Sequence, residues 1–180
     1  MRWLVLSLAL AAPAPALADC PPLPDRAEER ARLMEDLRNA PDPLAGQRAS
    51  DAMWAFWATA PDARAQEMLD RGMARRAAYD FDGARAAFED LIAYCPEYYE
   101  GYNQRAFVRF LTGDYGGALE DLNRTLARRP DHVGALSGKA LTLMQLGRIK
   151  ASQGVLREAV KLNPWLPERG LLIEEPGTEL

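Results

Sequence analysis

Histidine, cysteine and lysine are scarce in this sequence, and the shortages exclude several kinds of function. The 180 residues include one histidine, His132, and two cysteines. A single histidine excludes a multi-histidine metal site and a histidine-bridged catalytic pair within one chain. The glycines of the segment 113–117 lack the lysine and the preceding strand of a phosphate-binding loop. We therefore predict no catalytic residue, no metal site and no cofactor, and hence a protein that is not an enzyme.

Concentrated positive charge is also missing. The formal net charge is −4 at pH 7, and arginines such as Arg75 and Arg76 alternate with acids such as Glu67 and Asp80. Nucleic acids and anionic lipids are bound by concentrated basic surfaces, so neither is favoured as a partner. Charge that is interspersed in this way is typical of solvated helix faces.

The only long apolar run lies at the N-terminus and is typical of a secretion signal. Arg2 supplies a positive end, residues 3–12 are apolar, and residues 16–18 form a small-x-small cleavage site. A membrane-spanning helix is the alternative, but it needs about 20 apolar residues and Pro13 interrupts the run. Asp19, before the first cysteine, disfavours a lipid anchor. We predict a periplasmic protein of bacterial type, with a cleaved signal peptide and no membrane span in the mature chain.

A 34-residue repeat dominates the rest of the chain. Pro96, Pro130 and Pro164 are spaced by 34 residues, and the same residue types return between them. The matching sets are Met68, Tyr102 and Leu136; Gly72, Ala106 and Ala140; Ala84, Ala118 and Ser152; and Phe88, Leu122 and Leu156. A period of this length, with small and large apolar residues at fixed offsets, indicates an array of helical hairpins. One hairpin cannot bury both of its faces, so at least about three repeats are needed for a continuous core.

The middle block resembles a tetratricopeptide repeat (TPR). The residues that carry the resemblance are Tyr102, Ala106, Gly113, Asp114, Tyr115, Ala118, Leu122 and Pro130. The first block departs from the family at Tyr79, where a turn glycine is usual, and the third departs at Arg148 and Ser152. The resemblance implies an all-α, right-handed solenoid of antiparallel helix pairs whose concave surface binds other proteins.

The repeat register divides the chain into four parts. These are a signal peptide at 1–18, a leader and divergent N-terminal helix pair at 19–63, three TPR repeats at 64–166, and a C-terminal cap and tail at 167–180. Helix pairs are expected near residues 25–59, 64–93, 98–128 and 132–161.

The ends of the array carry large aromatic residues. We expect the divergent pair to stack at the front of the array, where Trp54, Phe56 and Trp57 would cover its open end. A ligand cage is the alternative for this aromatic group. Trp165 and Leu166 are expected to cover the other end.

Helix geometry predicts which side chains line the concave groove. The predicted partner-binding residues are Leu69, Met73, Asn103, Gln104, Phe107, Phe110, Leu141 and Met144. Most are apolar, which favours an apolar or amphipathic protein or peptide segment, with Asn103 and Gln104 bonding to its backbone. The alternative is that these side chains pack between repeats or beneath the chain's own Leu171-Leu172-Ile173.

TPR domains that clamp a C-terminal carboxylate carry lysine, arginine and asparagine on the inner face. This sequence has Leu69, Met73, Gln104, Gly134 and Gly138 at those places. The resemblance therefore argues against a carboxylate clamp.

Cys20 and Cys95 are the only cysteines, and export would place both in an oxidising compartment. A disulfide between them would tie the leader to the end of a repeat helix. Alternatively, Cys95 is a small buried residue and Cys20 is unpaired.

Two functions fit these patterns. The first is an exported TPR scaffold or adaptor that mediates protein–protein interaction through an apolar concave groove. The alternative is a periplasmic assembly chaperone that transiently shields apolar segments of envelope proteins. The sequence names no partner for either.

Overall fold

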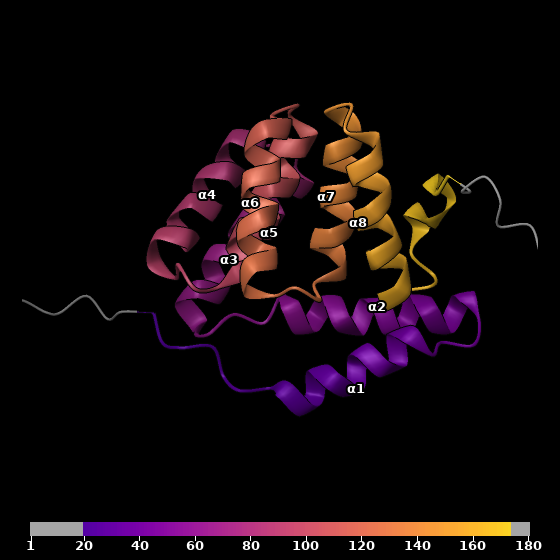
Figure 1. Cartoon of the computed structure of the whole chain (residues 1–180). Helices are drawn as coiled ribbons and strands as arrows, with labels where there is room; N and C mark the ends of the chain where they lie inside the picture. Colours follow the sequence, from indigo (N-terminus) through magenta and orange to yellow (C-terminus); the bar gives the residue numbers. More distant parts are fainter. Residues whose placement is uncertain (1–19, 174–180) are drawn as a thin grey trace, which may run out of the picture.

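Three antiparallel helix pairs stand side by side, and a fourth pair lies across one end of them (Figure 1). The computed structural model describes residues 20–173, and within that range it contains eight α-helices, one 3-10 helix and no strand. The expected all-α solenoid of helix pairs is confirmed. The helices are α1 (Ala27–Arg38), α2 (Pro43–Trp57), α3 (Ala63–Ala77), α4 (Phe81–Tyr94), α5 (Tyr99–Leu111), α6 (Tyr115–Arg128), α7 (Val133–Gln145), α8 (Ile149–Leu162) and the 3-10 helix η1 (Pro167–Leu171).

The turn within each of the three pairs follows the repeat. Gly113 and Gly147 adopt positive φ values of 82° and 71°, where glycine costs least. Tyr79 occupies the same place in the first pair with φ of 61°. This left-handed conformation is unfavourable for a residue that has a side chain. After the turn, Asp80 and Asp114 cap α4 and α6 by accepting the backbone N–H groups of the third residues beyond them.

Small residues bring the paired helices close together. A side chain at Gly72 of α3 would put its Cβ 2.3 Å from the ring of Phe88 on α4. Ala106 and Ala118, at the crossing of α5 and α6, are completely buried. The repeat of small residues therefore marks the helix crossings.

The N-terminal hairpin, formed by α1 and α2, does not stack at the front of the array. It runs across the ends of the other helices, on the side of the turns that connect one pair to the next (Figure 1). Its buried residues, among them Leu37, Met53 and Trp57, share a core with Val133 and Leu156 of the third pair. The expectation of a front-stacked pair is wrong, because the apolar faces of α1 and α2 match the second and third pairs and not the exposed side of the first.

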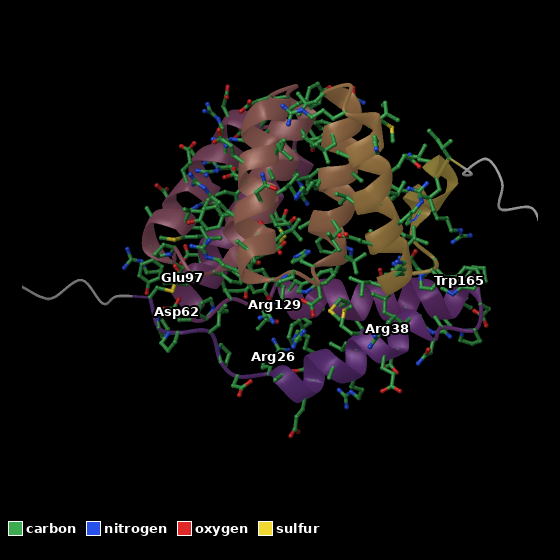
Figure 2. The ribbon with its side chains drawn as sticks, in the orientation of Figure 1. Arg26, Arg38, Asp62, Glu97, Arg129 and Trp165 are labelled. Atoms are coloured by element: carbon green, nitrogen blue, oxygen red, sulfur yellow. A yellow bond between two sulfur atoms is a disulfide. The ribbon has the colours of Figure 1, made fainter. Side chains whose placement is uncertain are left out.

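Trp165 and Leu166 pack on this hairpin and do not cover the far end of the array. The indole Nε1 of Trp165 donates to the carbonyl of Ala40 at 2.8 Å, and Gly46 of α2 leaves room for the ring. Figure 2 shows Trp165 beside the hairpin. The chain that follows α8 therefore fastens the hairpin to the repeats.

The leader that precedes α1 is fixed to the first pair. Cys20 and Cys95 form a disulfide with a Cα–Cα distance of 5.2 Å. Leu23 contacts both the core of the first pair and the core under the hairpin. The expected signal peptide at residues 1–18 lies outside the described residues. Among the helices that are described, none has the length and apolar character required to cross a membrane.

Candidate binding groove

A cavity of about 1090 Å³ opens on the concave face of the array, and we call it the groove. Its floor comes from the first helix of each pair, α3, α5 and α7. One face of α2 forms a wall, and residues 167–170 contribute to the rim. The N-terminal hairpin therefore contributes to the groove as well as to the stability of the repeats, because α2 forms one of its walls.

Six of the eight predicted groove residues line this cavity. They are Met73, Asn103, Gln104, Phe107, Phe110 and Leu141. Their role in binding stays a prediction. The C-terminal residues Leu171 and Ile173 do not fill the groove, since their backbones bond to Gln153 of α8.

The predictions that Leu69 and Met144 line the groove are wrong. Leu69 is completely buried in the core of the first pair, because Ala65, Leu69 and Gly72 form the buried stripe of α3 at helical spacing. Met144 is half-buried but does not line the groove.

Two large aromatic side chains remain open to the groove. Phe107 of α5 is 47% exposed and Trp54 of α2 is 41% exposed. The three aromatic residues that we expected to act together have different environments. Phe56 and Trp57 belong to the core, whereas Trp54 faces the groove. The sequence did not reveal this difference, because it depends on where α2 crosses the repeats.

Trp54 also explains a glycine on the groove floor. A Cβ added at Gly134 of α7 would lie 2.5 Å from the Trp54 ring. Any of the lysine, arginine or asparagine side chains that carboxylate-clamping repeats carry on the inner face would collide with Trp54 at this position. The geometry supports the argument against a carboxylate clamp.

A buried polar network lies beneath the groove. Glu100 of α5 and His132, the N-cap of α7, are both completely buried. His132 Nε2 lies 2.9 Å from Glu100 Oε2, while its Nδ1 accepts the backbone N–H of Ala135 at 3.1 Å. Since Nδ1 accepts a hydrogen bond, the proton is on Nε2, and the neutral ring donates to the carboxylate. Trp57 stacks on the imidazole with ring centroids 3.9 Å apart.

The same carboxylate orients two amides at the groove floor. Glu100 Oε1 accepts Asn103 Nδ2 at 3.0 Å and Gln104 Nε2 at 2.6 Å. Gln104 Oε1 in turn accepts a hydrogen bond from Arg76 Nη1. Gln104 is therefore committed to internal bonds and is less suited to a ligand's backbone than we predicted. Asn103 keeps its Oδ1, to which no donor in the described part of the chain bonds.

Arg76 is the cation of the groove floor. Its Cζ lies 4.8 Å from the centre of the Phe107 ring. Burial lowers the pKa of the guanidinium, and the nearby Glu100 charge opposes that shift. The sequence did not show that Arg76 would be held against Phe107.

The 34-residue register contains a signal that His132 has a structural role. It stands 34 residues after Tyr98, and both residues are fully buried N-caps of the helices they precede. The Tyr98 hydroxyl donates to the carbonyl of Trp57 at 2.9 Å, so both caps support α2. In the part of the chain that the structure describes, no group of histidine, cysteine and acidic residues could hold a metal ion.

Antiparallel helix pairs that stack around a concave groove define a helical-repeat protein of the solenoid class. A family model described as "Tetratricopeptide repeat" matches residues 69–131 and 108–167, which together cover more than half of the chain. The chain belongs to the tetratricopeptide repeat family.

Curated relatives share the repeats. A TPR repeat-containing protein of Rhizobium etli is 39% identical over 59 residues, which is 33% of this chain and 29% of that protein. Tetratricopeptide repeat protein 36 of Xenopus tropicalis is 35% identical over 98 residues, covering 54% of this chain and 47% of the relative. The chain therefore spans less than half the length of these relatives.

Solved TPR structures share the fold. The TPR2B domain of yeast Sti1, in complex with pHsp70, aligns with a TM-score of 0.55 at 23% identity and covers 56% of this chain and 81% of that chain. The first TPR of Spaghetti (RPAP3), bound to an HSP90 peptide, aligns with a TM-score of 0.56 at 17% identity and covers 57% and 82%.

Proposed function

We propose that this protein is an exported scaffold or adaptor that holds an apolar or amphipathic segment of a protein partner in the groove. The observation that carries the proposal is the pair of exposed aromatic side chains, Phe107 and Trp54, inside a concave cavity that lies above the buried polar network. Large apolar side chains that stay exposed in a hollow are typical of binding sites. The solved TPR domains that hold peptides support the same use of this surface.

The groove is tested by Phe107→Ala. Because Phe107 is about half exposed, we expect at least a tenfold loss of partner capture from envelope extract with a small loss of stability. Leu111→Ala is the matched control, since Leu111 lies on the same helix, is 46% exposed and is outside the groove. Capture is measured by quantifying the co-purified protein, and stability by thermal unfolding. Equal capture by Phe107→Ala and the wild type would show that the groove is not the binding surface.

Export is supported by two independent features. Residues 1–18 have the pattern of a secretion signal, and the Cys20–Cys95 disulfide suits an oxidising compartment. We expect a chain tagged at its C-terminus to be recovered from the periplasmic fraction of a bacterial host, with a mass reduced by residues 1–18. Recovery of the uncleaved chain from the cytoplasm would contradict export.

An assembly chaperone is the second candidate, and Met73 in the groove favours it because methionine adapts to varied apolar partners. The two candidates differ in what is captured. One stoichiometric partner indicates an adaptor, whereas many substoichiometric envelope proteins indicate a chaperone.

A further inference from the structure

We infer that the groove takes an internal stretch of its partner in which an acidic side chain pairs with Arg76 and a bulky apolar side chain packs against Trp54. This inference rests on the proposed function and adds the chemistry of the bound segment.

The surroundings of Arg76 leave most of its hydrogen-bonding capacity for a ligand. Its guanidinium is held over the Phe107 ring and donates one hydrogen bond within the described part of the chain, from Nη1 to Gln104 Oε1. Within residues 20–173, no carboxylate lies within ion-pair distance of it. A planar guanidinium in a partly dry site matches the geometry of a carboxylate, which accepts two parallel hydrogen bonds.

The neighbouring acid cannot supply that carboxylate. Glu100 already accepts three hydrogen bonds, from Asn103, Gln104 and His132, and it is completely buried. Turning Glu100 toward Arg76 would leave those buried donors without an acceptor, which is costly. The remaining N–H groups of Arg76 therefore suit an acid that comes from outside the chain.

Two other arginines on the first helices of the repeats have internal carboxylate partners. Arg75, the next residue on α3, pairs with Asp80 at 2.7 Å, and Arg109 on α5 pairs with Asp121 at 3.0 Å. Arg76 differs from them because it faces the groove. This contrast distinguishes it from ordinary surface charge.

Trp54 defines the apolar part of the site. Its ring meets Trp57 edge-on with centroids 5.3 Å apart and lies over Gly134 of the third repeat. Leu141, also on α7, lines the same cavity. Arg76 belongs to the first repeat, so a segment that touches both Arg76 and Trp54 crosses the floor of the groove.

An internal stretch fits better than a chain end. Two of the positions where clamping repeats carry lysine, arginine or asparagine are Gly134 and Gly138 on α7, and Trp54 fills the space beside Gly134. Arg76, the cation of the groove floor, can bond to a side-chain carboxylate anywhere along a peptide.

The test uses a synthetic library of random 12-residue peptides that are acetylated at the N-terminus and amidated at the C-terminus. Capping removes the terminal carboxylate, so any acidic preference must come from side chains. The library is selected on the wild type, Arg76→Gln, Trp54→Ala and the control Arg75→Gln. Arg75 is adjacent on the same helix but lies outside the groove. Circular dichroism and thermal unfolding check that each variant is folded.

We expect wild-type selections to combine Asp or Glu with a large apolar residue at a recurrent spacing. Arg76→Gln should lose the acidic preference, and a selected peptide should bind it about tenfold more weakly, while its Glu→Gln analogue should bind both proteins alike. Trp54→Ala should lose the apolar preference and keep the acidic one. Arg75→Gln should behave as the wild type.

The outcomes separate this inference from the function on which it rests. If the wild type selects no peptide from either a capped or an uncapped library, the proposed function fails. If capped peptides bind with no acidic preference, or if Arg76→Gln keeps that preference, the inference is overturned while groove binding stands. Binding that requires a free C-terminal carboxylate also overturns it.

Discussion

Glu100→Gln should lower the free energy of unfolding by about 3 kcal/mol, although it replaces a single heavy atom. The two carboxylate oxygens of Glu100 accept from Asn103, Gln104 and His132 in a completely buried site. An amide would replace one of these acceptors by a donor, so two N–H groups would face each other. His132 cannot adapt by moving its proton, because its Nδ1 accepts the backbone N–H of Ala135.

Urea unfolding at neutral pH measures this effect. Glu97→Gln is the control, since Glu97 is exposed and pairs with Arg128 on the surface at 3.1 Å. An exposed ion pair contributes about 0–1 kcal/mol, so the control should unfold near the wild-type midpoint. Equal midpoints for Glu100→Gln and Glu97→Gln would mean that the buried network does not hold α5 and α7 together.

The repeat register predicts most of the fold because it encodes local contacts. Equivalent residues such as Gly113 and Gly147 take the same turn conformation, and the expected helix pairs agree with α3 to α8 within a few residues. Each repeat contacts chiefly its neighbours, so a pattern in one block constrains the next. Tyr79 departs from the glycine pattern, and the turn keeps its geometry at a conformational cost.

The position of the N-terminal hairpin could not be predicted in the same way. Its sequence diverges from the repeat register of the other pairs, so the sequence showed only which of its residues are apolar. The docking depends on long-range contacts, such as Trp57 stacking on His132 and Trp165 bonding to Ala40. These contacts join residues 75 and 125 positions apart, which no periodicity reports.

The candidate site was predicted in part for the same reason. Helix periodicity placed Met73, Phe107 and Leu141 on the concave face. Leu69 was misplaced because adjacent positions on a helix differ by about 100°, and the sequence did not fix the rotation of α3 to that accuracy. Trp54 enters the groove from outside the repeats, so its exposure follows from the docking of the hairpin.

Replacing both cysteines by serine should destabilise the protein by up to about 4 kcal/mol. The Cys20–Cys95 disulfide closes a loop with a sequence separation of 75, so it removes much conformational freedom from the unfolded chain. In the folded state it holds the leader where Leu23 can pack on both cores. Loss of the bridge should therefore also release the leader and weaken the seat of the N-terminal hairpin.

Thermal unfolding with and without a reductant measures the contribution of the disulfide. The wild type should lose stability when it is reduced, whereas the double serine variant should be insensitive to the reductant and should match the reduced wild type. Thiol titration of the unfolded, unreduced mature protein provides a direct check, because a bridged protein has no reactive thiol. Two free thiols would show that the bridge does not form after export, and the leader would then be held by packing contacts such as those of Leu23.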